Sequence, residues 1–404
     1  MKPINRMAAL AIVGSTLPSL AQAEFLADSK GNLELRNFYF NRDFRQEGAR
    51  DKAEEWAQGF LLNIESGYTE GPVGFGVDAL GMLGLKLDSG GGTYGSGLLP
   101  NDGQPAQGSE DEYSKLGLTA KAKFSKSTLR LGDVRLRSPV VSSNDSRLLP
   151  ASFKGGLINV QEIENLTLQG GKFNQIRHNN STNYEDMTAL GGTSDEFIFA
   201  GGDYKFTPNF SAGLHYGNLE DVYKQYYGTL VYVLPLGENQ SLKTDVRYAK
   251  STEDGNFRNV DNKAFGTMLT YSLGGHAFTG AYQRMSGDDP FPFISDPYLV
   301  NFVQINNFSN AQERSWQARY DYNFAAIGIP GLTFMTRYIS GDNVNLGAGG
   351  EGKEWERDMD LGYVIQNGPL KNLGLKWRNA TVRSNFGNDL DENRLILSYS
   401  LALW

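Results

Sequence analysis

Apolar and polar side chains alternate along the last segment of the chain. The apolar positions include Leu395, Leu397, Tyr399, Leu401 and Leu403. The positions between and beside them include Arg394, Ser398, Ser400 and Ala402. Because successive side chains of a β-strand point to opposite faces, this period of two predicts a strand with one face toward hydrocarbon and the other toward water.

Similar alternating runs, broken by Gly, Asn, Asp and Pro, continue from about Leu33 to Trp404. Two hairpins are predicted, Tyr226–Leu234 with Leu242–Ala249 through Pro235-Leu236-Gly237, and Phe265–Leu273 with His276–Met285 through Gly274-Gly275. Strands of ~9–11 residues fit roughly 16 to 18 crossings into the residues that follow an expected leader. The pattern favours an all-β chain, a transmembrane antiparallel β-barrel, with Arg50–Ala57 as the best short helical candidate, placed in a loop.

The first 23 residues have the features of a secretory signal peptide. Lys2 and Arg6 supply positive charge, residues 7–20 are mostly apolar, and Ala21-Gln22-Ala23 offers a small-x-small cleavage site. The apolar run is too short for a membrane helix. We expect cleavage after Ala23, with residues 24–404 as one barrel domain and a net charge that moves from −8 to −10 (−8 − 2).

Composition narrows the function class. A mean hydropathy of −0.42 fits a membrane barrel, in which only alternate residues face lipid, but it also leaves a soluble secreted β-sandwich or lectin open. The chain has no cysteine, which removes disulfides and thiolate chemistry. Its acidic balance argues against nucleic acid as a partner. No spacing of His, Asp and Glu matches a ligand set, so we expect no metal and no cofactor.

Three stretches are too long and irregular to be barrel wall. They are Asp88–Glu112, Arg135–Gly156 and Ser286–Glu313. Long segments without regular structure in a compact domain usually cover a site or remain mobile. We therefore expect them to be loops.

Several blocks, in one order along the chain, resemble the OprD-type substrate-specific porins. The blocks are Arg36–Asp43, Glu55–Phe60, Pro139–Val141, Asn144–Pro150, Arg314–Gln317, Arg319–Asp321 and Gly368–Gly374. The resemblance implies an 18-stranded barrel in the bacterial outer membrane, narrowed by inward-folded loops at Pro139–Gly156 and Ser286–Glu313. It also implies passive, selective uptake of small carboxylate-bearing nutrients, with outer-membrane lipid, lipopolysaccharide and the barrel-assembly machinery as further partners.

Residues Asp296–Asn306 are similar to the branch of this family associated with monocyclic aromatic acids such as benzoate or vanillate. The alternative within the family is a porin for basic amino acids and small peptides. The oligomeric state stays open, because lipid-facing and subunit-facing strands carry similar apolar patterns.

Selecting a carboxylate in a wet pore calls for fixed positive groups, and guanidinium suits this because it stays charged and can bind through two hydrogen bonds. Candidates on the first strand and the last two strands are Arg42, Arg45, Lys376, Arg378, Arg383 and Arg394. The first and last strands of a closed barrel are neighbours, so these residues are expected on one sector of the wall. The resemblance to the family's lumenal basic ladder covers Arg42, Lys376, Arg378 and Arg394 most directly. The alternative is ordinary ion pairing with Asp43, Asp389 or Glu392.

The narrowest point is expected at Asn144–Phe153. Its candidate polar groups are Ser142, Ser143, Asn144, Asp145, Ser146 and Arg147. Asp288 and Asp289 are candidates for an opposing acidic side, unless they belong to a solvated turn. Phe291, Phe293 and Tyr298 either contact a ring-bearing substrate or pin the loop to the wall.

An outer-membrane hydrolase is the competing function of a different class. That chemistry needs a nucleophile with a base in reach, usually Ser with His. Only His178, His215 and His276 are available, and no Gly-x-Ser-x-Gly motif accompanies them. We therefore do not expect an enzyme.

Overall fold

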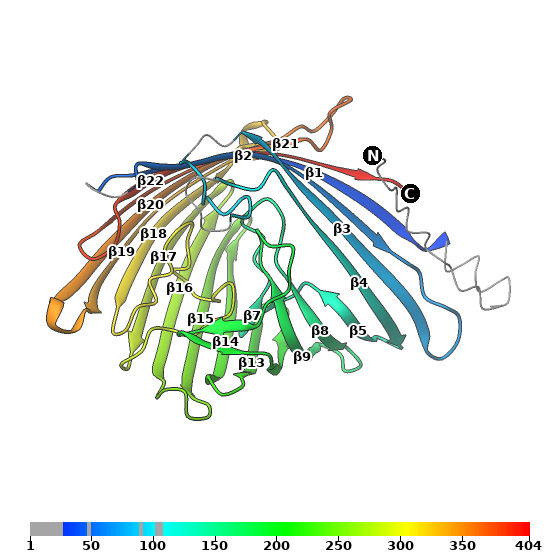
Figure 1. The fold of residues 1–404 in the computed structure, drawn as a ribbon, viewed down its shortest axis with the longest axis horizontal. Coiled ribbons are helices and arrows are strands. Elements are labelled where there is room, and N and C mark those ends of the chain that lie inside the picture. The colour runs from blue at the N-terminus through cyan, green and yellow to red at the C-terminus, as the bar shows by residue number, and fades with distance from the viewer. Residues whose placement is uncertain (1–26, 47–49, 89–91, 102–107) are drawn as a thin grey trace, which may run out of the picture.

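The computed structural model describes residues 27–46, 50–88, 92–101 and 108–404, so the expected signal peptide lies outside the described residues. One antiparallel sheet of 18 strands closes on itself, because the first strand, β1 (Lys30–Phe44), pairs with the last, β22 (Leu390–Ala402). In Figure 1, β1 in blue runs beside the red carboxyl-terminal strand. The predicted 18-stranded barrel is confirmed.

The remaining wall strands follow one another in chain order, each paired with its neighbour. They are β2 (Lys52–Glu65), β3 (Gly74–Asp88), β4 (Glu112–Phe124), β5 (Ser127–Val134), β8 (Ser152–Val160), β9 (Leu166–Arg177), β12 (Phe197–Thr207), β13 (Phe210–Leu219), β14 (Tyr223–Gly237), β15 (Gln240–Glu253), β16 (Asp261–Leu273), β17 (His276–Ser286), β18 (Arg314–Asn323), β19 (Leu332–Asn345), β20 (Glu351–Val364) and β21 (Gly374–Ser384).

Short elements lie outside the wall. They are the ribbons β6 (Arg137–Ser138) with β7 (Val141–Ser142) and β10 (Met187–Ala189) with β11 (Gly192–Ser194), and the 3-10 turns η1 (Phe324–Ile327) and η2 (Gly347–Gly349). No helix among the described residues is long and apolar enough to cross a membrane.

The alternation in the sequence becomes an outer and an inner surface. Leu33 of β1 lies opposite Leu401 of β22 on the outer face, whereas Arg36 lies opposite Ser398 on the lumenal face. Outer residues such as Leu214 on β13 are 77% exposed because their natural contact is lipid.

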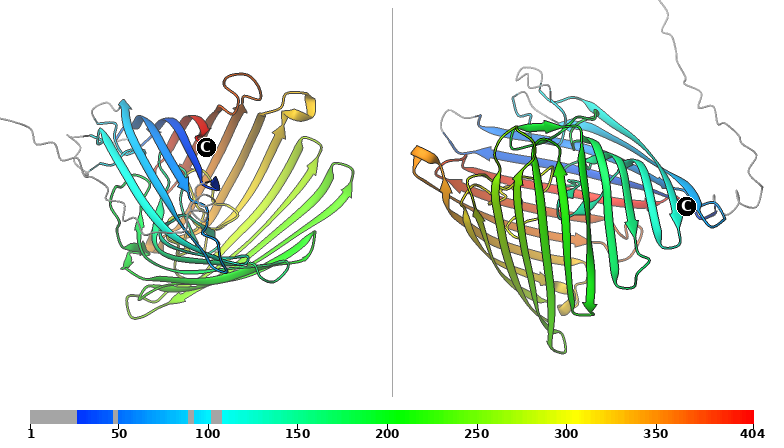
Figure 2. Two further views of the ribbon diagram at one scale, coloured as in Figure 1. Left: turned by 90° about the vertical axis from the view of Figure 1, so that its right-hand side faces the viewer. Right: turned by 90° about the horizontal axis from the view of Figure 1, so that it is seen from below.

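The four longest connections between wall strands lie at one end of the barrel, which we call the loop end. The opposite end, which we call the turn end, has only shorter connections. The long ones are residues 89–111, 135–151, 178–196 and 287–313. In outer-membrane barrels the long loops face the exterior and the short turns face the periplasm. Figure 2 shows the strands curving around segments that fold into the ring.

Several predicted boundaries need correction. Arg50–Ala57 is not a helix, since β2 begins at Lys52. The loop predicted to end at Gly156 ends at Ala151, because residues from Ser152 pair with β9. The sequence does not predict the long loop at residues 178–196, because its polar residues are of the same types as those of an ordinary turn. The hairpin at Gly274-Gly275 is confirmed.

Two apolar clusters inside the barrel fasten the long loops to the wall. In the first, Leu98 and Leu148 pack beside Phe38, Phe40 and Leu61 of β1 and β2. The second includes the loop residues Val140, Val141, Phe291, Ile294 and Leu299. A membrane barrel therefore carries its buried core in the lumen, where the loops are folded in.

Gly132 on β5 stands opposite Gly155 on β8, directly below the 135–151 loop. Its φ of 140° is open to glycine and costly for other residues. A Cβ here would collide with the carbonyl oxygen of Leu118 on β4. This glycine lets the wall strands approach closely where the loop turns inward.

Candidate functional site in the lumen

Two loops meet inside the barrel and narrow it. Ser142 in the 135–151 loop forms a β-bridge with Ser295 in the 287–313 loop. Beside it, the Asn144 side-chain amide donates a hydrogen bond to the Asp296 carboxylate. Asn179 from the 178–196 loop donates to the Asn144 side-chain oxygen at 2.8 Å. The constriction is thus a joined structure built from three loops.

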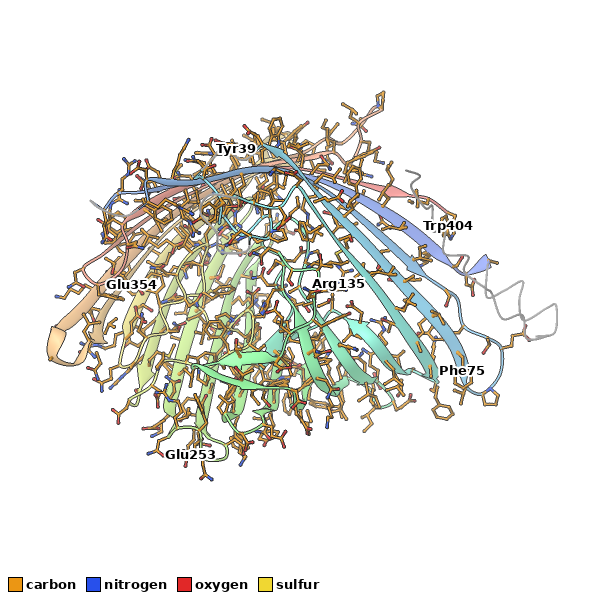
Figure 3. All side chains as sticks on the ribbon, in the orientation of Figure 1. Tyr39, Phe75, Arg135, Glu253, Glu354 and Trp404 are labelled. Carbon is orange, nitrogen blue, oxygen red and sulfur yellow. The ribbon has the colours of Figure 1, made fainter. Side chains whose placement is uncertain are left out.

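A cavity of about 950 Å³ opens beside this junction. Its six arginines are Arg130, Arg135, Arg137, Arg147, Arg378 and Arg394, and its five acids are Glu65, Asp78, Asp133, Asp145 and Asp296. Its apolar residues include Phe293, Pro297, Phe302, Val303 and Ile305. Figure 3, in which Arg135 is labelled, shows the many side chains that fill this part of the barrel.

Three of the cavity's acids are already neutralised by cations. Asp78 pairs with Lys121 at 2.5 Å, Asp145 pairs with Arg36 at 2.7 Å, and Asp133 pairs with Arg177. Glu65 accepts a hydrogen bond from Asn63, and Asp296 accepts one from Asn144. Among the described residues, these two carboxylates therefore have neutral partners and no cationic one.

Four of the cavity's arginines have no ion-pair partner among the described residues, namely Arg130, Arg135, Arg137 and Arg147. Arg378 and Arg394, in contrast, hold Asp360 and Glu392. Four unpaired cations thus face two unpaired carboxylates, which leaves the constriction with an excess of positive charge. Arg135 and Arg137 are also exposed to the lumenal water.

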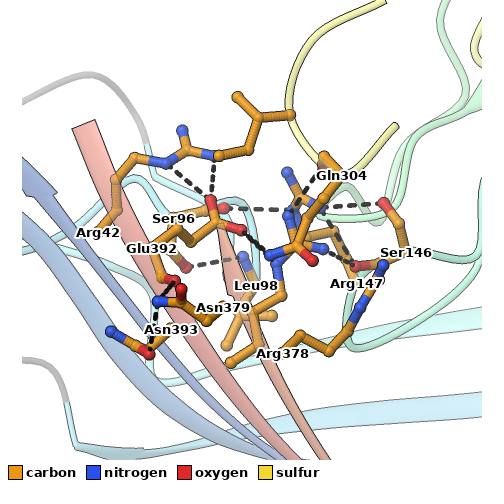
Figure 4. Close-up of polar contacts among 12 residues, drawn as sticks. Arg42, Ser96, Leu98, Ser146, Arg147, Gln304, Arg378, Asn379, Glu392 and Asn393 are labelled. Atoms are coloured by element: carbon orange, nitrogen blue, oxygen red, sulfur yellow. Dashed lines mark hydrogen bonds and ion pairs between the residues drawn. The ribbon is translucent and has the colours of Figure 1, made fainter. Parts of the chain in front are cut away.

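Arg42 and Arg394 share one buried carboxylate. Glu392 is fully buried and receives Arg42 Nη2 at 2.6 Å (Figure 4). It also receives Arg394 Nε at 2.6 Å. Their guanidinium groups also lie over the Phe40 ring, as does that of Arg147, at 5.4, 4.9 and 5.3 Å from its centroid. Gln304 of the 287–313 loop donates to the same carboxylate at 3.0 Å. This arrangement fixes the loop against the basic wall.

Arg147 is held without a carboxylate. It donates to the carbonyl oxygen of Ser96 at 3.2 Å and to Ser146 Oγ at 2.9 Å (Figure 4). Burial, assisted by the nearby charge of Arg394, lowers the pKa of Arg147 to about 9. The group therefore still carries its charge at neutral pH.

Arg378 and Lys376 lie one step apart on the lumenal face of β21 and share Asp360 of β20. Arg378 Nε contacts the carboxylate at 3.0 Å, and Lys376 Nζ contacts it at 3.2 Å. Arg378 lines the cavity, whereas Lys376 lies toward the turn end and belongs to a smaller pocket there.

Arg45 and Arg383 lie on the predicted sector of the wall, but neither lines the lumenal cavity. Arg45 follows β1 at the rim, is 52% exposed and pairs with Asp391 at 2.7 Å. Arg383 pairs with Asp391 at 2.9 Å and occupies the outward-facing phase of β21. Alternation along β21 accounts for Arg383, because it lies six residues from Trp377 and therefore on the same outward face.

The predicted loop residues separate into two groups. Ser143, Asn144, Asp145, Ser146 and Arg147 line the cavity, whereas Ser142 serves the β-bridge. Asp288 is exposed and does not line the cavity. Asp289 is buried, pairs with Arg258 and accepts the Asp261 backbone amide at 3.0 Å, so it anchors the loop rather than facing a substrate.

The loop aromatics also divide. Phe293 lines the cavity and Phe291 is buried in the core, while the guanidinium of Arg247 lies 3.9 Å from the Tyr298 ring centroid. Sequence reasoning missed Arg130, Arg135 and Arg137. The available signal was the alternation of Arg135 and Arg137 around Leu136, within the expected loop.

The three histidines lie apart from one another. His178 lies in the 178–196 loop, His215 faces Asp203 at 3.6 Å, and His276 contacts Tyr320 at 2.9 Å. None of these rings hydrogen-bonds a serine hydroxyl in the part of the chain that the structure describes.

A closed barrel with a lipid-facing exterior and a charged, loop-narrowed lumen defines an outer-membrane porin. The protein-family model described as "outer membrane porin, OprD family" matches residues 23–403. The chain belongs to the OprD family, whose members serve substrate-specific uptake across the outer membrane.

Known relatives agree with this membership. The porin-like protein GalP of Pseudomonas putida is 41% identical, covering 97% of this chain and 96% of that protein. Porin D of Pseudomonas aeruginosa is 38% identical, covering 97% and 95%. Both are porins, which are channels rather than enzymes.

Solved structures match closely as well. Pseudomonas aeruginosa OpdO has 58% identity and a TM-score of 0.87, covering 95% of this chain and all (100%) of that chain. A BenF-like porin from Pseudomonas fluorescens has 41% identity and a TM-score of 0.91, covering 94% and 100%.

Proposed function

We propose that this porin takes up small carboxylate-bearing nutrients, preferentially monocyclic aromatic acids such as benzoate or vanillate. The observation that supports the proposal best is the set of four arginines without ion pairs, among the described residues, beside the constriction. A guanidinium without a carboxylate partner keeps its donors available for an incoming anion. Several such groups in series can bind an anion and release it again.

The rest of the cavity suits a planar ring. Phe293, Phe302, Pro297 and Ile305 contribute apolar surface next to the arginines. An aromatic acid could place its carboxylate on Arg135 or Arg137 while its ring covers these side chains. An aliphatic acid would use the charges but leave the apolar surface uncovered.

Uptake of basic amino acids or small peptides is the second candidate. It is favoured by Asp296 and Glu65, the cavity carboxylates that have no cationic partner among the described residues. These acids would bind an ammonium or guanidinium group. They are outnumbered by the unpaired arginines, and so we place this function second.

Single-channel recordings with a panel of solutes distinguish these functions. Benzoate, vanillate, acetate and arginine are added in turn to the refolded protein in a planar bilayer. We expect the two aromatic acids to alter the current at lower concentration than acetate, and Arg135→Ala to weaken their effect. If arginine acted at the lowest concentration, the second candidate would replace the first.

We also propose that residues 1–23 are removed on export. Mass measurement of the protein from outer membranes tests this, because a chain that retains Met1 would contradict it.

A further inference from the structure

Five consecutive strands carry the same outward pattern near the loop end of the barrel. On each of β14 to β18, which lie side by side (Figure 1), a basic residue stands two positions from an aromatic residue, on its loop-end side. The pairs are Lys224 with Tyr226, Lys250 with Tyr248, Lys263 with Phe265, Arg284 with Tyr282, and Arg314 with Trp316. We call the five basic residues the outer basic row.

The row faces away from the lumen, at the edge of the membrane. Its aromatic partners are 39–56% exposed, whereas Ala249, Ala264 and Gln283, each of which separates the two members of a pair, are buried on the lumenal side. Aromatic residues on the outside of a membrane barrel form girdles at the two edges of the hydrocarbon band. The outer basic row lies beyond such a girdle toward the loop end, which is the level of the lipid headgroups in the outer leaflet.

The register brings like charges face to face within the row. Lys250 lies directly opposite Lys263, and Arg284 lies directly opposite Arg314. Like charges at directly opposite positions destabilise a sheet, because their Cβ atoms are only about 4.5–5.5 Å apart. An anion placed at each pair would remove this repulsion.

Carboxylates of the protein neutralise only the two ends of the row. Lys224 pairs with Asp254 at 2.6 Å, and Arg314 pairs with Asp342 at 3.4 Å. Asp261 lies on the outward face of β16 nearer the loop end, but it forms no ion pair with the row. The members without an ion-pair partner among the described residues are Lys250, Lys263 and Arg284.

The spacing of the two like-charged pairs suits more than one anionic group. The pair on β15 and β16 is separated from the pair on β17 and β18 by two strand spacings, roughly 10 Å or more. One phosphate group cannot contact both pairs at that separation. Guanidinium binds phosphate through parallel hydrogen bonds, and the lysine ammonium binds it as a point charge.

An apolar groove of about 980 Å³ lies beside the row on the outer wall. It reaches Tyr248, which is two positions from Lys250, and extends across β14, β13 and β12 to β9. Its floor is formed by outward positions that have no side chain, Gly170, Gly202 and Gly228. A groove of this kind, within the hydrocarbon band, suits an acyl chain.

We infer that the outer basic row and this groove together bind an outer-leaflet lipid that carries more than one phosphate group, which is the headgroup chemistry of the lipopolysaccharide anchor. Its phosphate groups lie at the Lys250–Lys263 and Arg284–Arg314 pairs, and one of its acyl chains enters the groove.

Two lipids with identical acyl chains test this on the unmodified protein. Refolded protein in detergent micelles is titrated with bisphosphorylated lipid A and with its monophosphorylated form, and native mass spectrometry counts the bound lipids. The bisphosphorylated lipid should bind about tenfold or more tightly, because its second phosphate meets a second pair of cations. Equal binding of the two lipids would overturn the inference, and this comparison needs no variant to fold.

The double variant Lys250→Gln with Lys263→Gln should weaken binding of the bisphosphorylated lipid about tenfold or more. The matched control is Lys172→Gln with Lys353→Gln, which removes two outward cations that already pair with Glu196 and Glu351. The control should bind the lipid as the unmodified protein does. Equal weakening in the two double variants would overturn the inference, and so would the loss of a bound second copy of the chain, instead of lipid, from the first.

Two further arms separate a lipid from a free anion. Gly228→Leu fills the floor of the groove without changing the row, and it should also weaken binding of the bisphosphorylated lipid. Inorganic phosphate at the concentration of the lipid should not displace it. Displacement by inorganic phosphate, together with unchanged binding in Gly228→Leu, would overturn the assignment to a lipid.

Discussion

Asn144 donates a hydrogen bond to Asp296 inside the barrel, and this contact joins the two loops that narrow the lumen. Asp296→Ala removes the acceptor. We expect the loops to separate more often, so that single-channel current becomes noisier and mean conductance rises. Recordings in symmetric potassium chloride measure both quantities.

Asp296→Asn is the matched control for this prediction. It retains an oxygen acceptor for Asn144 but removes the charge. Its current should stay as quiet as that of the unmodified protein. The permeability of the pore to chloride relative to potassium, measured from reversal potentials, should increase. Equal noise in both variants would show that the contact does not hold the loops.

Asp296 should also make selectivity depend on pH. Burial, which outweighs the hydrogen bond from Asn144 and the charge of Arg137, raises the pKa of Asp296 above its ordinary 3.8. As pH falls toward the ordinary carboxyl range, this group takes up a proton before exposed carboxylates do. Chloride selectivity should rise over that window in the unmodified protein and much less in Asp296→Asn.

The same shift has a defined sign for stability. A carboxyl group whose pKa is higher in the folded state than in the unfolded state contributes its full stabilisation when the pH is below the unfolded-state pKa. This contribution is lost as pH rises through the folded-state pKa. The contribution of Asp296 to the free energy of unfolding should therefore decrease as pH rises from 3.8 to the raised pKa. In Asp296→Asn, the free energy of unfolding, measured by urea titration at several pH values, should depend less on pH over that range.

Glu392→Gln should destabilise the barrel. The carboxylate is fully buried between Arg42 and Arg394, and its loss leaves two guanidinium charges without compensation. Breaking a buried ion pair on one side costs about 3–5 kcal/mol. Urea unfolding followed by tryptophan fluorescence measures the change. A second substitution, Arg42→Gln, should recover part of the loss, and no recovery would contradict the shared-carboxylate account.

Gly132→Ala should lower stability by more than about 1 kcal/mol, because alanine adopts a φ of 140° poorly and its Cβ would meet the Leu118 carbonyl oxygen. Gly280→Ala provides the control, since a Cβ there meets nothing within 4 Å. Equal unfolding midpoints for the two variants would contradict the strain argument.

Much of the fold follows from residue types in the sequence. Strict alternation, as in Leu395 to Leu403, fixes which face of a strand meets lipid, and Gly274-Gly275 fixes a turn. The helix proposed at Arg50–Ala57 was wrong because pairing of β2 with β1 and β3 outweighs local helical preference.

The site was only partly accessible from the sequence. Arg42, Arg378 and Arg394 are on the lumenal phase as expected, but Arg383 faces outward and Arg45 lies at the rim. The unpaired state of Arg135 and Arg137 depends on where loop carboxylates lie after folding. No local pattern encodes that, because the pairing partners are distant in the chain.

The central claim is that unpaired arginines at the constriction bind carboxylates. The most direct measurement is the concentration of benzoate that alters the single-channel current, in the unmodified protein and in the double variant Arg135→Ala with Arg137→Ala. Loss of these charge-assisted contacts should raise that concentration by about tenfold or more, whereas the rim variant Arg45→Ala should match the unmodified protein. An unchanged benzoate response in the double variant would contradict the account.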